Sequence, residues 1–287
     1  MLYSLVVNHV TNLFSVLLVK PVKKLLSILV LFISTAALAL DTPAPPAKRA
    51  RKLTVMTYNI HHCNPPSAGT TIDVAAIARV ITNEKPDLVA LQEVDVNTER
   101  SGNGLNQARE LARQTGMRFF FAKAIDHQGG DYGVAILSRF PIIDSTRLIL
   151  PVDPAVGGET RTIAAITVEI ARGKRIIFAS THLDLKEQNR LTQADQIINL
   201  FKGSNLPVIL GGDFNALSSS RVIQLLDQHF VRSCQDCQPT IPVRNPNRAI
   251  DFIMFKPASA VKPIATRVID EQYASDHLPV VAELDVL

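Results

Sequence analysis

The sequence predicts an α/β protein in which two β-sheets stack on each other and helices cover their outer faces. Apolar runs typical of buried strands recur along the chain from residue 53 onward. Stretches with helical periodicity lie between some of these runs. With 287 residues, 47% of them hydrophobic, the chain can also bury a sizeable core. Many strands with few helices between them fit a layered architecture.

Several of the expected strands are continuous apolar runs and not clean alternations, so we expect those to be buried on both faces. In chain order they are residues 53–60, 86–94, 118–124, 132–143, 161–170, 174–185, 206–214, 249–256 and 278–286. Apolar residues at helical spacing predict helices around residues 72–81, 108–112, 187–202 and 220–228.

Residues 1–40 have the layout of a secretory signal peptide. Lysines precede an apolar stretch, residues 25–40, and small residues at 37–39 offer a cleavage site. The stretch is short for a membrane span, which needs about 20 apolar residues. An uncleaved anchor in the inner membrane is the alternative. We therefore expect an exported protein, periplasmic or secreted, or one anchored to the inner membrane.

Two further segments follow this leader. Residues 41–52 are rich in proline and basic residues without an apolar period, which predicts a linker. No second linker or repeat interrupts residues 53–287, which predicts one catalytic domain.

Charge and cysteine content restrict the function classes. A net charge of +4 permits a phosphate-bearing substrate without singling out nucleic acid, and the lack of tryptophan argues against a stacking platform for single strands. Cys234 and Cys237 have the spacing of a metal or redox pair, but no second pair lies near enough in sequence to complete a zinc site. A local bridge in an oxidising compartment and two free loop cysteines both remain open.

Polar residues able to bind metal or move protons stand at the ends of the predicted strands, where rigid scaffolds hold functional loops. Each has a plainer explanation alone, such as a turn or a helix cap. Glu93 fits that explanation poorly, because an unpaired buried carboxylate is costly. Together the residues are poorly explained as independent turns; they are Asn59, Glu93, His182, Asp213, Asn215, Asp251, Asp276 and His277.

The stretch "GGDFNA" predicts its own local geometry. Gly211 and Gly212 would let this strand end approach its neighbour closely. In an extended chain Asp213 and Asn215 share one face, and Phe214 points the other way, into the core.

Seven segments resemble the endonuclease/exonuclease/phosphatase superfamily in order and approximate spacing. They are "TYNIH", "LQEVD", "YGVAILSRFPI", "STHLD", "GGDFNA", "IDFIMF" and "SDHLPVV". The resemblance covers nearly all of residues 53–287 and implies a four-layer α/β/β/α sandwich, with two mixed sheets flanked by helices. It also implies hydrolysis of a phosphoester that depends on Mg²⁺ or Mn²⁺.

The resemblance implies a metal site and a water-activating residue. Glu93 would be the principal metal ligand, with Asn59 beside it and Asp276 as a further ligand, because Mg²⁺ prefers carboxylate and amide oxygens. Asp213 would orient or deprotonate the attacking water, and Asn215 would hold the pentacovalent phosphorane.

The remaining residues would contact the phosphate. His277, paired with Asp251, would donate to a phosphate oxygen or assist the water. His182 would lie near the scissile phosphate. For Arg161 two roles remain open, a bidentate phosphate clamp and an ion pair at the surface.

The superfamily does not fix the substrate. The segments "TYNIHH" and "AIDHQGGDYGVAILSR" resemble a group of exported bacterial members, which favours a phosphodiester in a lipid head group or envelope component at a membrane surface. A secreted nuclease is the rival. A catalytically silent binding domain would require a missing core residue, and none is missing. We expect a monomer without an obligate protein partner.

Overall fold

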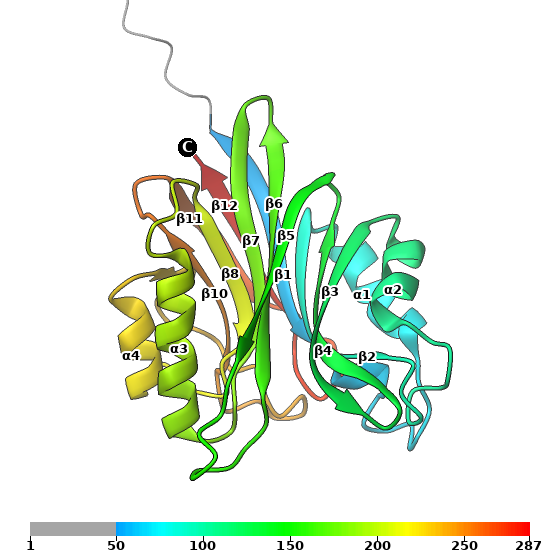
Figure 1. Cartoon of the computed structure of the whole chain (residues 1–287). Helices are drawn as coiled ribbons and strands as arrows, with labels where there is room; N and C mark the ends of the chain where they lie inside the picture. Colours follow the sequence, from blue (N-terminus) through cyan, green and yellow to red (C-terminus); the bar gives the residue numbers. More distant parts are fainter. Residues whose placement is uncertain (1–49) are drawn as a thin grey trace, which may run out of the picture. The chain divides into compact units, whose positions relative to one another are not determined.

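The two expected sheets are present, each with six strands (Figure 1). The computed structural model describes residues 50–287, so the predicted leader, residues 1–40, lies outside the described residues, as does most of the predicted linker. The first strand begins at Arg51, two residues before the predicted start of the domain. Within residues 50–287, no helix is both long and apolar enough to cross a membrane.

The first sheet has the strand order β11-β12-β1-β2-β4-β3, and β1 and β2 are parallel. Its strands are β1 (Arg51–Asn59), β2 (Leu88–Val96), β3 (Arg118–His127), β4 (Gly130–Ser138), β11 (Val261–Val268) and β12 (Val280–Val286).

The second sheet has the order β5-β6-β7-β8-β10-β9, and β7 and β8 are parallel. Its strands are β5 (Ile142–Leu150), β6 (Arg161–Ala171), β7 (Lys174–His182), β8 (Val208–Asp213), β9 (Val231–Arg232) and β10 (Asp251–Lys256).

Helices cover the outer face of each sheet, which completes four layers (Figure 1). Buried residues of α1 (Val74–Glu84) and α2 (Gln107–Thr115) pack on the first sheet. Those of α3 (Glu187–Phe201) and α4 (Arg221–Asp227) pack on the second. A third apolar cluster, which includes Val55 and Phe178, fills the space between the sheets. The predicted sandwich, including its helices, is therefore confirmed.

Two parts of the strand prediction were wrong. The run 132–143 is two strands in different sheets, because the chain leaves β4 at Ser138 and β5 begins only at Ile142, after Pro141. Proline supplies no backbone donor for a strand ladder. The edge strands β9 and β11 were not predicted, since β9 has only two residues and β11 contains Pro263 with most of its side chains exposed.

The glycines at the end of β8 permit the close contacts that the sequence predicts. A Cβ atom at Gly211 would lie 3.0 Å from the Cβ atom of Ala90 and 3.1 Å from that of Thr57, both in the facing sheet. A Cβ atom at Gly212 would lie only 2.6 Å from the backbone oxygen of Thr181 in β7. Glycine is therefore required for both the spacing of the sheets and the spacing of the strands.

A buried polar layer joins the sheets beside these glycines. The Nε2 atom of Gln92 donates to the Oγ atom of Ser180 at 3.1 Å, and Ser180 donates to the carbonyl oxygen of Leu91 at 3.1 Å. Hydrogen bonds between side chains and backbone fix orientation more strictly than apolar packing does. The two strand ends therefore meet in a defined register.

We predict that Gly212→Ala lowers the free energy of unfolding by about 1–3 kcal/mol, the usual cost of overpacking a tight site. Urea unfolding followed by circular dichroism measures this. Gly203→Ala is the matched control, because a Cβ atom there meets nothing within 4 Å. Equal stability of the two variants would contradict the close-approach explanation.

Candidate active site

The carboxyl ends of β1, β2, β7 and β8 meet at one edge of the sandwich. Asn59, the last residue of β1, is fully buried there. Its Nδ2 atom donates to Glu93 Oε1 at 3.0 Å and to Asp213 Oδ2 at 3.0 Å. Its Oδ1 atom accepts from the backbone N–H of His61 at 3.1 Å. One amide thus joins a carboxylate of each sheet.

A bulge in β2 presents Glu93. The register between β2 and β4 shifts between Leu91 and Val94, and Glu93 has φ 57°, a left-handed conformation that is costly for a residue with a side chain. The side chain is 22% exposed, and its Oε2 atom lies 4.0 Å from Nδ1 of His62. Burial opposes ionisation, but the neighbouring His62 and His182 and the bond from Asn59 outweigh it and lower the pKa of Glu93. Glu93 is therefore an anion.

Asp213 is a buried carboxylate near a second carboxylate. Burial and the negative charge of Asp251 raise the pKa of Asp213 to about 7, although His277 and the hydrogen bonds from Asn215 and Asn59 act in the opposite direction. Its Oδ2 atom lies 3.7 Å from Nε2 of His277. A carboxylate with this pKa can accept a proton near neutral pH.

His277 and Asp251 form the expected dyad. The Nδ1 atom of His277 lies 2.9 Å from Asp251 Oδ2, which also accepts from Thr240 Oγ1 at 2.5 Å. Burial disfavours the charged ring, but Asp251 and Asp213 outweigh it and raise the pKa of His277 to about 10. The ring is therefore an imidazolium, with its Nε2–H directed toward Asp213.

His182 has the opposite protonation state. Burial and the charge of Arg161 lower its pKa well below the usual value. Its Nδ1 atom lies 3.3 Å from Nη1 of Arg161, and its Nε2 atom lies 3.0 Å from Nδ2 of Asn215. Both neighbours are hydrogen-bond donors, so a protonated ring would have no lone pair for either of them. His182 is neutral and positions Asn215.

Asn215 reaches the site by a turn and not by strand alternation. Strand β8 ends at Asp213, and Asn215 has φ 48°. The backbone N–H of Asn215 donates to Asp213 Oδ1 at 2.8 Å, as in an Asx turn. The predicted shared face is observed, but its cause is this turn. Phe214 is buried in the core, as predicted.

Two predicted residues lie at the margin of the cluster. Arg161 is buried and lies 2.8 Å from Glu159, so it is not a surface residue. It contacts the site through His182. Asp276 is half-buried, and its one described side-chain hydrogen bond is a 3.4 Å contact with Ser275 Oγ. No described contact joins Asp276 to Glu93, so its role as a further metal ligand stays a prediction.

Sequence reasoning missed His62, Thr240 and Ser275. His62 carried a signal, because it is the second of two histidines that follow the "TYNI" strand end. Ser275 donates to the carbonyl oxygen of Asn59 at 2.7 Å and precedes the predicted Asp276. Thr240 carried no signal, since its contact with Asp251 depends on a long loop that returns to the strand end.

Two groups of side chains could hold a cation. Ligand atoms of Asp213, Asp251 and His277 all lie within 4.8 Å of one another. An imidazolium has no free lone pair for a metal, however, and His277 already binds Asp251. At Glu93 an ionised carboxylate faces the buried Nδ1 atom of His62, which has no hydrogen-bond partner. The donor set at Glu93 therefore fits a divalent cation better.

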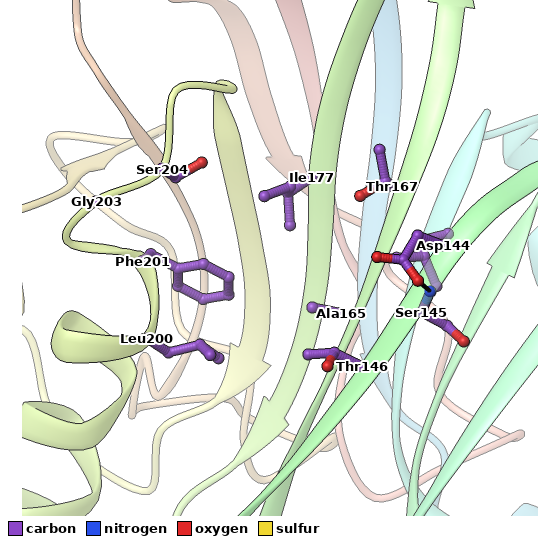
Figure 2. Close-up of a pocket in the computed structure, with 11 residues that line it drawn as sticks. Asp144, Ser145, Thr146, Ala165, Thr167, Ile177, Leu200, Phe201, Gly203 and Ser204 are labelled. Carbon is purple, nitrogen blue, oxygen red and sulfur yellow. Dashed lines mark hydrogen bonds between the residues drawn. The ribbon is translucent and has the colours of Figure 1, made fainter.

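A separate cavity of about 320 Å³ lies on the outer side of the second sheet, between the end of α3 and strands β5 to β7 (Figure 2). Leu200, Phe201 and Ile177 are among its apolar lining residues, and Asp144 is its one charged lining residue. None of the clustered strand-end residues lines it, so we assign it no part in the chemistry.

Comparisons with known proteins identify a family model and a relative that match this chain. A model described as "Endonuclease/Exonuclease/phosphatase family" matches residues 56–277. "Uncharacterized protein YbhP" of Escherichia coli (strain K12) is 32% identical over 176 residues, which are 58% of this chain and 68% of YbhP.

Solved structures share the fold. An endonuclease/exonuclease/phosphatase from Beutenbergia cavernae has a TM-score of 0.70 at 24% identity, over 82% of this chain and 72% of that chain. The human Nocturnin catalytic domain with bound sulfate has a TM-score of 0.63 at 20% identity, over 86% of this chain and all of that chain.

We predict that Asp251→Asn lowers the pKa of His277 from about 10 toward the ordinary value near 6.5. NMR titration of the His277 ring measures this. Because folding raises the pKa of His277, protonation of this ring stabilises the folded protein. This stabilisation is complete below about pH 6.5 and is lost as the pH rises through about 10. Asp236→Asn removes an exposed carboxylate and serves as the control. An unchanged His277 titration in Asp251→Asn would contradict the dyad.

Proposed function

Because the chain belongs to the Endonuclease/Exonuclease/phosphatase family, we propose that it is a divalent-metal-dependent hydrolase of phosphodiesters. One observation carries the proposal. The anion Glu93, the buried base Asp213 and the cation His277 occupy a single edge, where Asn59 bridges the two carboxylates. Attack of water on a phosphodiester needs a base, a cationic contact for the phosphate and a metal ligand, and these three side chains supply them.

In this mechanism Asp213 takes a proton from the attacking water. A pKa of about 7 suits this transfer near neutral pH. The N–H groups of Asn59 and Asn215 fix the carboxylate at 3.0 and 2.8 Å, which sets the direction of the accepting oxygen. Orientation of this kind lowers the entropic part of the barrier.

His277 and Asn215 supply donors for the phosphate. The imidazolium Nε2–H carries positive charge toward the site, and Asp251 with Thr240 prevents the ring from turning. Asn215 donates to the carbonyl oxygen of Leu183 at 2.9 Å and lies 3.0 Å from His182, so its amide is held before the substrate arrives. Preorganised donors cost little reorganisation during the reaction.

Glu93 would hold the divalent cation, which we propose is Mg²⁺ or Mn²⁺, and the His62 ring lies beside its carboxylate. When bound, the cation polarises a phosphoryl oxygen and neutralises developing charge. Asn59 holds Glu93 in the bulge, and the strained backbone at Glu93 keeps the carboxylate directed into the site.

For the substrate we propose a phosphodiester of a lipid head group or envelope component, encountered at a membrane surface, with a secreted nuclease as the rival. The resemblance of "TYNIHH" and "AIDHQGGDYGVAILSR" to a group of exported bacterial members supports the first choice. We propose export because residues 1–40 have the layout of a signal peptide, and because Cys234 and Cys237 form a disulfide, a bond typical of oxidising compartments.

We predict that Asp213→Asn lowers kcat on bis-p-nitrophenyl phosphate by about 10²–10⁴-fold, the usual contribution of a general base. Release of p-nitrophenol by the full-length protein measures it. Asp227→Asn, which alters a carboxylate on α4, is the control and should leave kcat unchanged. An unaffected Asp213→Asn would contradict the mechanism.

We predict that EDTA abolishes this activity and that Mg²⁺ or Mn²⁺ restores it. Glu93→Gln should weaken Mn²⁺ binding at least about tenfold, in line with loss of an ionised ligand, as measured by electron paramagnetic resonance of free Mn²⁺. Glu99→Gln, an exposed residue beyond the same strand, is the control. Turnover in EDTA would contradict metal dependence.

We predict turnover of phosphatidylinositol or sphingomyelin vesicles at enzyme concentrations that leave plasmid DNA intact. Phosphate-containing products are measured by chromatography and nicking by gel electrophoresis, with Asp213→Asn as the blank. Nicking of DNA at lower enzyme concentration than lipid turnover would overturn the lipid assignment in favour of a nuclease.

A further inference from the structure

A cavity of about 450 Å³ adjoins the active site on the side of the His277–Asp251 dyad. The loop 241–248 forms one wall, and Asp276, next to His277 in sequence, forms another. Pro66 and Ser67, in the loop that follows β1 and its short 3₁₀ helix η1 (His61–Cys63), close a third side. The cavity therefore lies beside the site and is lined by loops from both sheets.

Two arginines give this cavity a positive charge. Arg244 and Arg248 line it, and among residues 50–287 neither guanidinium has a hydrogen bond or ion pair. Two arginines near the same edge differ, because each is paired with a carboxylate. Arg161 lies 2.8 Å from Glu159, and Arg100 lies 2.7 Å from Asp95. Asp276 is the one acidic residue in the cavity lining. Two cations against one anion favour an anionic ligand.

The loop that carries these arginines is fixed to the catalytic dyad. Ile241 and Arg248 pair as an antiparallel bridge, with the Arg248 N–H donating to Ile241 at 3.0 Å. The Val243 N–H donates to the carbonyl oxygen of Asp276 at 2.9 Å. At the base of the loop, Thr240 binds Asp251. Bonds to Asp251 and to Asp276, the neighbour of His277, thus hold the backbone of the loop beside the dyad.

We propose that Arg244 and Arg248 bind a second phosphate of the substrate, distinct from the phosphoester that is hydrolysed. The proposal rests on the proposed function. Guanidinium groups bind phosphate bidentately, and two unpaired ones beside a phosphoesterase site match a neighbouring phosphate on the same molecule. The cavity cannot serve the scissile group, because neither Asp213 nor His277 lines it. The second phosphate belongs either to a nucleotide chain or to a phosphorylated head group.

A matched pair of chromogenic substrates tests this. Thymidine 5′-(p-nitrophenyl phosphate) and its 3′-phosphorylated form share one scissile bond and differ only in the second phosphate. The full-length protein should prefer the 3′-phosphorylated form in kcat/KM. Arg244→Gln/Arg248→Gln should reduce this preference by about 10- to 100-fold, the loss expected for charged hydrogen bonds.

The control is Arg51→Gln/Arg172→Gln, which removes the same charge at the first residue of β1 and in the turn before β7, at the ends of these strands opposite to Asn59 and His182. It should keep the preference of the unmodified protein. Loss of preference in the control, or a retained preference in Arg244→Gln/Arg248→Gln, would overturn the proposal and leave the proposed hydrolysis intact.

Binding in EDTA separates this proposal from the proposed function, because it requires no turnover. Calorimetry should show tighter binding of thymidine 3′,5′-bisphosphate than of thymidine 5′-monophosphate, and the difference should vanish in Arg244→Gln/Arg248→Gln. Competition by a trinucleotide or by glycerophosphoinositol 4-phosphate then identifies the source of the phosphate by the stronger inhibitor. Equal binding of both thymidine nucleotides, or inhibition by neither competitor, would contradict a second phosphate site.

Discussion

The site depends on the buried amide of Asn59, which binds Glu93 of one sheet and Asp213 of the other. A single side chain at the end of β1 thereby sets the separation of the two carboxylates, at 3.0 Å from each. Two neighbouring carboxylates repel each other, and a donor between them offsets this repulsion. The polar layer of Gln92 and Ser180 and the absence of a side chain at Gly211 bring the two sheets close enough for this contact.

The charges around Asn59 are divided between two functions. On one side Glu93 is ionised and faces His62, and this arrangement suits a divalent cation. On the other side the protonated His277 ring lies between the carboxylates of Asp213 and Asp251 and interacts electrostatically with both. Such a network is costly to bury unless nearly every group has a partner. Its retention in the interior is explained by the chemistry that we propose for it.

The sequence predicted the sandwich well, because the apolar runs and helical periods reflect burial, which is a local property of each element. It also located the strand-end residues. It could not show the bulge that turns Glu93 into the site, since one extra residue leaves no periodic signal. Asn215 lies on the predicted face, but an Asx turn places it there, whereas the sequence predicted strand alternation.

Contacts between distant segments were beyond the sequence. Thr240, Arg244 and Arg248 lie in a loop of polar residues and prolines whose composition indicates only an irregular segment. Its importance comes from the bonds of Thr240 to Asp251 and of Val243 to Asp276, which exist only in the folded chain. The pairing of Cys234 with Cys237 was one of two open alternatives, and the structure contains the disulfide.

The central claim is that metal binding and proton transfer use different sides of Asn59. The most direct test is a crystal structure of the protein with Mn²⁺, with the ion located by anomalous scattering. We predict a peak beside the carboxylate of Glu93 and the ring of His62, with His277 still bound to Asp251. A peak between Asp213, Asp251 and His277 would contradict the account, because Asp213 would then be a metal ligand and could not serve as the base.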